Sequence, residues 1–335
     1  MDTFNDNLKQ AEDLENKEEY FQSAHYYKQA LKLALDKGNS KDIILCKNKC
    51  VEMNQKSILS GKDFREISVE HALNEQQCKQ LDELIDTFFE EKNTNAILKR
   101  IGRNASFIPK ISVVKDSANK TIPISYQIVN MSMISNEGHS LRGSEDGQLL
   151  WQMSMYDISL QVILILYLNK IFINFMAFES IDKRLTYENL LNYFISIEII
   201  PEKRLEIIKH GLKHFFQDDY ISCLHILIPQ FESLFLHVSQ LCGMDIVALD
   251  QKLGIATHTK TLSDKYLETE EFIKVWGEDY CQLIKFVLFE PLGYKLRHKI
   301  AHGEILPEEC NLQNCTLTLY LFLVILGRIE KINKH

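Results

Sequence analysis

The chain has 335 residues, of which 45% are hydrophobic and 25% are charged, proportions typical of a folded globular protein. Its net charge of −8 excludes a protein that coats nucleic acid nonspecifically, because that mode of binding needs many lysines and arginines facing phosphates. The charge does not exclude a small nuclease pocket with its own local field. The length allows one large core, or two modest ones with a helical extension.

The cysteines and the first residues indicate the cellular compartment. Eight cysteines are scattered without a Cys-x-x-Cys pair, so we expect reduced and mostly buried thiols. Cys46 and Cys50 lie one helical turn apart, but no second pair of Cys or His completes a zinc site. The first twenty residues are polar and acidic, unlike a signal or transit peptide. We expect a cytoplasmic protein that does not bind membranes.

Two apolar runs resemble membrane-spanning segments at first sight. Residues 158–178 are interrupted by Asn169, Lys170 and Asn174, and residues 317–326 are fewer than the roughly 20 that a spanning helix needs. We expect both runs to be helices that are buried on all sides.

The N-terminal region, residues 1–60, predicts a helical hairpin. Few prolines and glycines interrupt the chain, and we expect helices over residues 4–16 and 19–36, the second ending at Gly38. In the second helix the apolar residues recur every three or four positions: Phe21, Ala24, Tyr27, Ala30, Leu31 and Ala34. The hairpin loosely resembles one tetratricopeptide repeat. It is either a helical cap on the main body or a docking module for a protein partner or inhibitor.

The middle region, residues 61–147, changes character along its length. A helix is expected over residues 75–91, begun by Asn74. Residues 107–129 are rich in Ile, Val, Ser and Thr and contain two prolines, which predicts extended segments or a small hairpin. A polar, glycine-containing loop at 136–147 then marks the boundary to a C-terminal helical region, residues 148–335.

The C-terminal region predicts a bundle of helices. An amphipathic stripe over 205–216 precedes a helix over 221–241, where Pro229 predicts a kink or a break. Residues 249–265 form a polar connection of undefined structure. Residues 272–288 match the spacing of a single helix almost without fault, and the last helix covers 315–329. The predicted fold class is therefore all-α.

The segment that carries chemistry lies between the last two predicted helices. Arg297 is followed by four residues, then His302 and Gly303. This spacing pairs a permanent cation with a side chain that exchanges a proton near neutral pH. Cleavage of a phosphodiester without a metal needs both a base for the attacking hydroxyl and a fixed positive charge for the developing phosphorane.

Two stretches, 211–235 and the decapeptide LRHKIAHGEI at 296–305, resemble the HEPN superfamily, whose ribonucleases carry Arg, four to six residues and then His. More narrowly, they resemble a HEPN-like domain with an RNxxxHG signature, which would occupy about residues 202–335. The resemblance implies that His302 is the general base for the ribose 2′-hydroxyl and that Arg297 binds the scissile phosphate. It also implies an RNA substrate, 2′,3′-cyclic phosphate and 5′-hydroxyl ends, and no cofactor or metal.

HEPN domains usually pair so that two Arg-His motifs line one cleft, which implies a homodimer. Many HEPN ribonucleases serve as toxins or in anti-phage defence. The signature's Asn is replaced here by His298, which also donates and accepts hydrogen bonds. Glu232 is expected to hold Arg297 or His298 in place.

Three other interpretations of these residues stay open. Arg297 and His302 would form a helix-junction network, with Arg297 satisfying helix-end carbonyls and His302 held by a buried polar partner. His298 and His302, four residues apart, would chelate a metal with Glu304 as the third ligand. Gly303 would either relax the backbone at a helix end or let RNA approach closely.

The alternative function is a noncatalytic helical module for dimerisation, RNA binding or protein interaction. An enzyme would place Arg297 and His302 in a cleft that solvent reaches, whereas a scaffold would bury them against backbone carbonyls.

Overall fold

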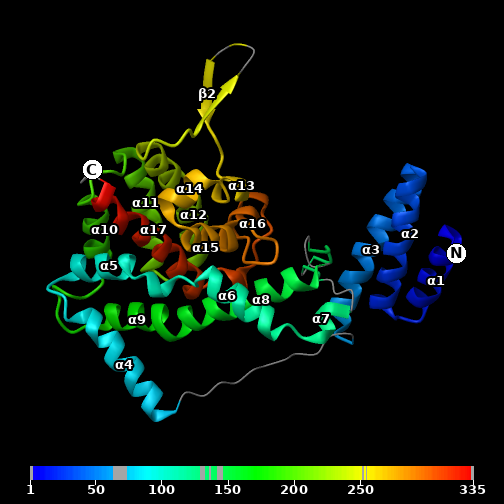
Figure 1. Ribbon diagram of the computed structural model, residues 1–335, viewed down its shortest axis with the longest axis horizontal. Helices are drawn as coiled ribbons and strands as arrows, with labels where there is room; N and C mark the ends of the chain where they lie inside the picture. The colour runs from blue at the N-terminus through cyan, green and yellow to red at the C-terminus, as the bar shows by residue number, and fades with distance from the viewer. Residues whose placement is uncertain are drawn as a thin grey trace. The chain divides into compact units, whose positions relative to one another are not determined.

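The computed structural model describes residues 3–62, 74–128, 133–135, 137–141, 146–250, 253 and 255–332. Contacts divide the chain into unit 1 (Met1–Ala72 and Ile124–Leu150) and unit 2 (Leu73–Pro123 and Trp151–His335). In the described ranges the regular structure is mostly helical, with a single two-stranded sheet (Figure 1). The predicted all-α fold class is confirmed. The predicted division into regions 1–60, 61–147 and 148–335 stays a prediction.

Unit 1 is built on three consecutive helices. They are α1 (Phe4–Asn16), α2 (Tyr20–Lys37) and α3 (Ser40–Ser60); the unit also contains α7 (Ile124–Ile128) and the first residues of α8 (Gly147–Ile163). The two helices of the predicted hairpin are present as α1 and α2, and α3 packs against α2. Their shared core contains Ala11, Ala24, Tyr27 and Met53. Gly38 adopts the left-handed conformation that ends α2.

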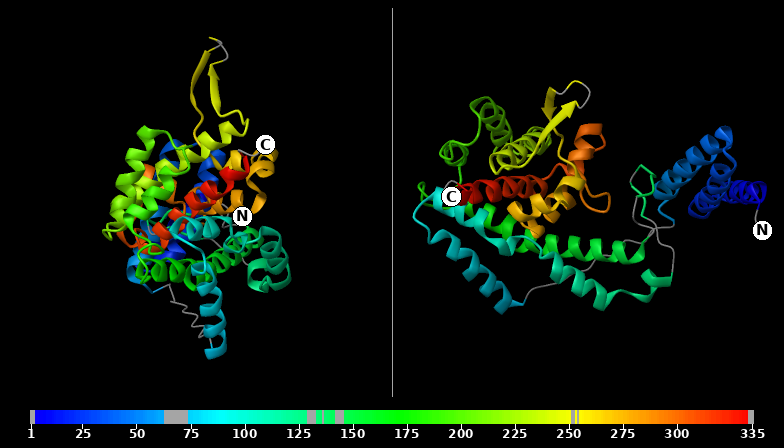
Figure 2. Two further views of the ribbon diagram at one scale, coloured as in Figure 1. Left: turned by 90° about the vertical axis from the view of Figure 1, so that its left-hand side faces the viewer. Right: turned by 45° about the horizontal axis from the view of Figure 1, so that its top comes forward.

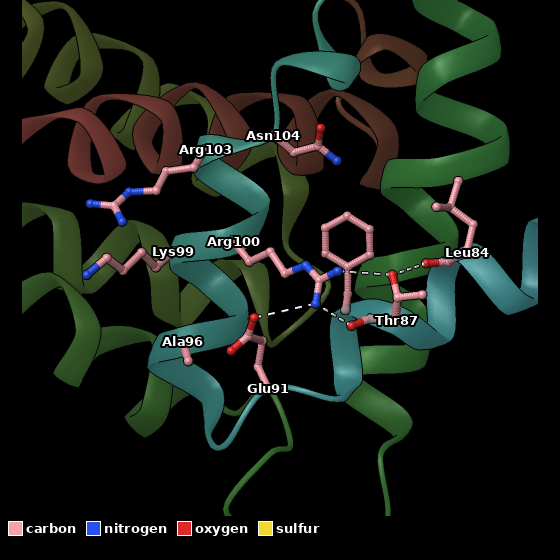
Figure 3. Close-up of a pocket in the computed structure, with 9 residues that line it drawn as sticks. Leu84, Thr87, Glu91, Ala96, Lys99, Arg100, Arg103 and Asn104 are labelled. Carbon is pink, nitrogen blue, oxygen red and sulfur yellow. Dashed lines mark hydrogen bonds and ion pairs between the residues drawn. The ribbon is translucent and has the colours of Figure 1, made fainter.

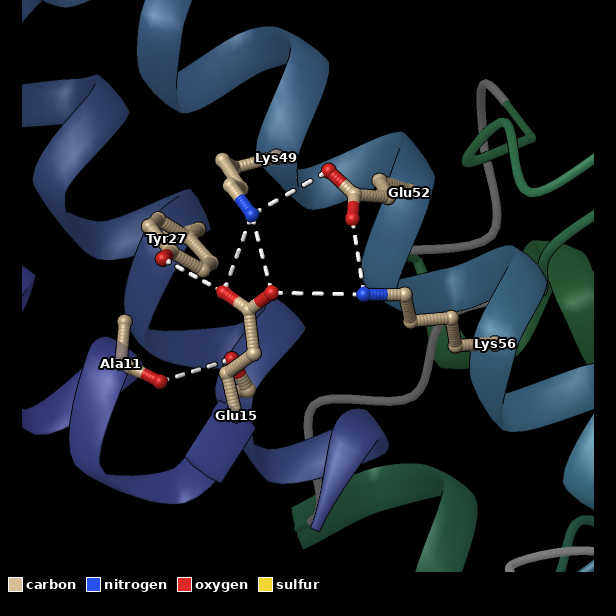
Figure 4. A network of polar contacts seen from close by, with 7 residues as sticks. Ala11, Glu15, Tyr27, Lys49, Glu52 and Lys56 are labelled. Carbon is tan, nitrogen blue, oxygen red and sulfur yellow. Dashed lines mark hydrogen bonds and ion pairs between the residues drawn. The ribbon is translucent and has the colours of Figure 1, made fainter. Parts of the chain in front are cut away.

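A half-buried carboxylate joins the helices of unit 1 (Figure 4). Glu15 on α1 accepts hydrogen bonds from Lys49 at 2.9 Å and Lys56 at 3.3 Å, both on α3, and from the hydroxyl of Tyr27 at 3.1 Å on α2. Burial by itself raises the pKa of Glu15, but these three hydrogen bonds outweigh it and hold the pKa below its usual value. The carboxylate therefore stabilises unit 1 in its charged form.

We expect Glu15→Gln to destabilise unit 1 by about 1 kcal/mol at pH 7, since charge-assisted hydrogen bonds are lost. The pKa of Glu15 is lowered by folding, so its contribution is present above the unfolded-state pKa and disappears as the pH falls through the lower folded value. Hydrogen exchange of the α2 amides at pH 7 and in acid measures this difference. Glu12→Gln, an exposed position on the same helix, is the control. Equal effects of both variants at pH 7 would contradict the prediction.

Unit 2 holds the remaining helices and the sheet. Its helices are α4 (Glu75–Phe89), α5 (Thr94–Arg103), α6 (Ile111–Thr121), the rest of α8, α9 (Asn169–Ala177), α10 (Tyr187–Ile195), α11 (Glu202–Phe215), α12 (Tyr220–Leu241), α13 (Asp264–Leu267), α14 (Glu270–Trp276), α15 (Glu278–Leu288), α16 (Leu296–His302) and α17 (Leu312–Ile332). A π-helical turn at Leu164–Leu168 joins α8 to α9, and 3₁₀ turns lie at Ala105–Phe107 and Pro307–Glu309.

Helix α17 forms the centre of unit 2 (Figure 1). It packs against α5 and α12, and all its residues from 315 to 326 are buried. Gly102 on α5 lets the two backbones approach closely, because an added Cβ would lie only 2.1 Å from the carbonyl oxygen of Leu323. The predicted burial of residues 317–326 is confirmed.

The prediction of extended structure at 107–129 is wrong. Residues 111–121 form α6, whose buried side chains Ile111, Val114 and Ala118 follow helical rather than alternating spacing. Residues 124–128 form α7. The prolines mark helix boundaries: Pro123 immediately precedes α7, and Pro109 lies two residues before α6. Residues 129–132 lie outside the described part of the chain.

The prediction of a single helix over 272–288 is also wrong. It is divided into α14 and α15 at Gly277, whose φ of +83° is incompatible with a continuous helix. A kink or a break was expected at Pro229; the break does not occur, because α12 runs through this residue as one helix. The helix tolerates the missing amide where the proline side chain is exposed.

The polar connection at 249–265 contains most of an antiparallel hairpin. Strand β1 (Val247–Asp250) pairs with β2 (Ile255–Thr259), with an irregularity in register between Ala248 and Leu249. The hairpin extends away from the helices of unit 2 (Figures 1 and 2), and β2 is exposed along its length. Because neither face of β2 is buried, its sequence lacks the alternation of apolar and polar residues from which a strand is predicted.

Three helical stretches are long and apolar enough to cross a membrane, judged by length and composition. They are Gly147–Ala177, Tyr220–Leu241 and Leu312–Ile329, whose most apolar windows are 33%, 50% and 78% buried. The prediction that 158–178 is buried on all sides is wrong. Ile158 and Ile165 are more than half exposed, and Val162 and Ile173 nearly so.

Candidate functional site

The Arg-His segment folds as the short helix α16. Leu296 anchors its first turn, with 1% of its surface exposed, and α16 packs against α12 and α15. Gly303 ends the helix with a φ of +70°, and its amide donates to the carbonyl of Ile300 at 3.3 Å. The amide of Glu304 donates to the carbonyl of Lys299 at 2.7 Å and closes the turn. Gly303 therefore relaxes the backbone at the end of α16, as the first of its two interpretations expects. A side chain at this position would meet open space, so close approach of RNA stays open too.

Arg297 is held by a carboxylate from a distant part of the sequence. Its Nε donates to Oε2 of Glu232 on α12 at 3.1 Å, while Oε1 of Glu232 accepts from the amide of Leu262 at 3.0 Å. The side chains are 27% and 14% exposed respectively. Because both oxygens of Glu232 have partners, the carboxylate is fixed, and the guanidinium keeps one orientation. The helix-junction interpretation expected Arg297 on helix-end carbonyls, and its ion pair is with Glu232 instead.

The two histidines of α16 lie together. The ring centroids of His298 and His302 are 4.3 Å apart, as their spacing of one helical turn allows. His302 is exposed, and within the described ranges its imidazole has no hydrogen bond. The helix-junction interpretation expected a buried polar partner for His302, and the described residues supply none. A solvent molecule or ligand can therefore reach His302.

His298 has a more restricted environment. Partial burial and then the positive charge of Lys295 lower the pKa of His298, while Glu304, at 3.8 Å from its Nε2, opposes the change. Glu304 also pairs with Lys295 at 3.5 Å. The lowered pKa favours the neutral imidazole of His298, in which one ring nitrogen donates a hydrogen bond and the other accepts one, as an Asn side chain does.

Arg297 and His302 point to different sides of α16. Five positions along an α-helix correspond to a rotation of about 140° around its axis. Arg297 is turned toward α12 by Glu232, whereas His302 lies on the side of His298. The sequence motif places both residues on one helix, but a single copy of that helix does not make them converge.

The metal-ligand geometry gives the chelation interpretation no support. In the part of the chain that the structure describes, no group of three or more His, Cys, Asp or Glu side chains is arranged to hold an ion. No disulfide joins any two of the eight cysteines, all of which lie in the described ranges; Cys46 is buried, and the thiol of Cys50 donates to the carbonyl of Ala24 at 3.6 Å.

A pocket that the sequence did not predict is lined in part by Glu232. It has a volume of about 440 Å³ and is formed by α11, the exposed face of α12 and the base of the hairpin. Its lining residues are Arg204, Pro229, Gln230, Glu232, Ser233, Leu236, His237, Gln240, Ile246, Thr259, Lys260 and Thr261. The only signal in the sequence was the spacing of Ser233, His237 and Gln240 on one face of α12, which becomes informative once the hairpin is known.

A second cleft lies between α4 and α5 (Figure 3), with a volume of about 600 Å³. Three cations, Lys99, Arg100 and Arg103, line it. Arg100 donates to the carbonyl and the hydroxyl of Thr87 near the end of α4 and stacks on Phe88 with its charge 5.0 Å from the ring centroid. Arg100 therefore joins the two helices, which is a structural role.

The chain matches no protein-family model, no curated protein and no solved structure. The interpretation of α16 rests on its own residues and their geometry.

Proposed function

We propose that the protein is a metal-independent endoribonuclease of HEPN type. The observation that supports this best is the arrangement on α16: an arginine fixed by a carboxylate from another helix, on the same two turns as an accessible histidine. A fixed cation stabilises developing charge at no cost of reorganisation, and an accessible imidazole can accept a proton from substrate.

In the proposed reaction His302 removes the proton from a ribose 2′-hydroxyl. The 2′-oxygen attacks the adjacent phosphorus, and Arg297 balances the negative charge of the phosphorane. The bond from phosphorus to the 5′-oxygen then breaks, and this oxygen takes a proton from water and leaves as a hydroxyl, so that the other fragment ends in a 2′,3′-cyclic phosphate. His298 orients the substrate by hydrogen bonding, as the Asn of the signature would. Glu232 positions Arg297, and Glu304 with Gly303 shapes the end of the helix.

The proposed enzyme acts as a homodimer through its HEPN-like domain. Since Arg297 and His302 diverge on one helix, two copies of α16 facing each other would bring the arginine of one beside the histidine of the other. We place the activity in the cytoplasm, where RNA is available and cysteines without disulfides stay reduced. A role as a toxin or in anti-phage defence fits such an enzyme, with unit 1 available to a protein partner or inhibitor.

A noncatalytic dimerisation or interaction module is the second candidate. It is favoured by the stripe of exposed apolar side chains along α8 and α9, formed by Ile158, Val162, Ile165 and Ile173. Such a stripe is typical of a surface that binds another protein. This function needs neither an accessible His302 nor a fixed Arg297.

Incubating the purified protein with total RNA and with tRNA in EDTA tests the proposed function. We expect cleavage that resists EDTA and leaves 2′,3′-cyclic phosphate and 5′-hydroxyl ends, because no step uses a metal. Fragment ends are identified by whether ligation or labelling requires prior phosphatase or kinase treatment. Fragments with 3′-hydroxyl ends would overturn the mechanism. The absence of cleavage by a folded dimer would favour the interaction module.

A further inference from the structure

The pocket beside Glu232 has the chemistry of a nucleotide-binding site. Its volume of about 440 Å³ falls in the usual range of small-molecule pockets, roughly 300–1,000 Å³. Nine of its twelve lining residues are polar, and the apolar ones are Pro229, Leu236 and Ile246. Apolar surface beside convergent hydrogen-bonding groups suits a base and a ribose, whose faces are apolar and whose edges are polar.

The charged groups of the pocket favour an anion. Arg204 and Lys260 line it from opposite elements, α11 and the base of the hairpin. The carboxylate of Glu232 is already occupied by Arg297 and the amide of Leu262, so it does not cancel these charges. Lys260 is paired with Asp245 at 2.9 Å, which offsets its charge, whereas Arg204 has no ion pair among the described residues. The guanidinium of Arg204 is therefore the group that attracts a phosphate.

Several polar groups of the pocket have no partner in the protein. Within the described residues, the side chains of Arg204 and His237 make no hydrogen bond or ion pair. The Oε1 atom of Gln230 is buried and also lacks a hydrogen bond. A buried polar atom without a partner costs free energy, and a bound ligand can supply the missing bond.

The pocket and the candidate catalytic arginine share one wall. Glu232 lines the pocket and accepts from Nε of Arg297 at 3.1 Å, so one side chain of the pocket wall also contacts the guanidinium. We propose that this pocket binds a ribonucleotide of the RNA chain next to the scissile phosphate, with Arg204 and His237 as ligands of its phosphate and Gln230 as a ligand of its base. This inference rests on the proposed ribonuclease function and extends it to substrate binding.

Binding of an RNA analogue that lacks the reacting hydroxyl tests the pocket separately from catalysis. The probe is a 2′-O-methyl oligoribonucleotide, which the proposed mechanism is unable to cleave. We expect Arg204→Gln and His237→Gln each to raise the Kd about tenfold, as the loss of one charge-assisted hydrogen bond implies. Ser233→Trp, which fills the pocket without changing its charge, should weaken binding as well.

Lys203→Gln is the matched control, because it removes one positive charge from an exposed neighbouring position on α11 that does not line the pocket. Wild-type affinity in the Arg204 and His237 variants, an equal loss in Lys203→Gln, or no binding by the wild-type protein would overturn the proposal. Cleavage of unmodified RNA, measured in parallel, distinguishes the two hypotheses. Pocket-dependent binding without cleavage would reject the ribonuclease function alone, whereas cleavage with an unchanged KM in the pocket variants would reject the pocket alone.

Discussion

RNA cleavage by His302→Ala is expected to fall by about 10²–10⁴-fold, the usual contribution of a general base. Arg297→Ala is expected to lose about 10²–10³-fold, comparable to the loss of a group that stabilises developing negative charge. Because His302 is exposed and makes no hydrogen bond within the described residues, its removal should leave the fold intact. The measurement is the initial rate of cleavage at saturating RNA, alongside circular dichroism and the molecular mass in solution.

Arg297→Ala needs a second variant, because it leaves the part-buried Glu232 without its partner. Arg297→Lys keeps the charge and loses the planar fork, so it should retain the fold with much reduced activity. His210→Ala, which removes an exposed histidine from α11, is the control for loss of an imidazole elsewhere. Cleavage at the wild-type rate by folded His302→Ala would show that α16 does not perform the reaction.

The largest effect on stability is expected from Gly102→Ala. The new methyl group would lie 2.1 Å from the carbonyl oxygen of Leu323, and backbone on both sides prevents relief by a side-chain rotation. Helices α5 and α17 must then separate, which we expect to cost about 3 kcal/mol of unfolding free energy, the upper end of the usual range for overpacking. Chemical denaturation followed by tryptophan fluorescence measures it, because Trp276 lies in the core of unit 2.

Gly327→Ala is the matched control on the facing helix. Its added methyl group would meet Cγ of Arg103 at 3.3 Å, and this flexible side chain can move by a few tenths of an ångström. Alanine also favours a helix by about 1 kcal/mol over glycine, so the net change should be close to zero. A similar loss in both variants would show that the close contact at Gly102 is not special.

The predictable parts of the fold are those with clear local signals. Asn74 and Gln77 form a capping box at the residue where α4 was expected to begin, and α1 has the predicted ends. The failures came from residues whose role depends on distant contacts. The Ile- and Val-rich composition of α6 indicated strands, while its helical burial is set by packing. Gly277 divides a run of perfectly spaced apolar residues, since a single positive φ outweighs periodicity.

The candidate site could be predicted in composition but not in geometry. Spacing alone placed His298 and His302 on one helical face, and their rings do lie together. Glu232 was proposed as a partner of Arg297 or His298 without any local signal to choose between them, and the structure places it on Arg297. The pocket with Arg204 and Lys260 was missed because these residues are 56 positions apart and meet through the fold of the hairpin.

Because α16 is short, the free energy needed to open it locally differs from the free energy needed to unfold the whole of unit 2. This helix has seven residues and a single buried side chain, Leu296, whereas α17 is buried continuously from residue 315 to residue 327. Local opening of α16 therefore disrupts few apolar contacts and requires far less free energy than global unfolding. A mutation that weakens the core of unit 2 leaves the population of ordered α16 unchanged while the molecule stays folded. Loss of the Glu232–Arg297 ion pair, by contrast, acts on the site directly, because it removes a contact that joins α16 to α12.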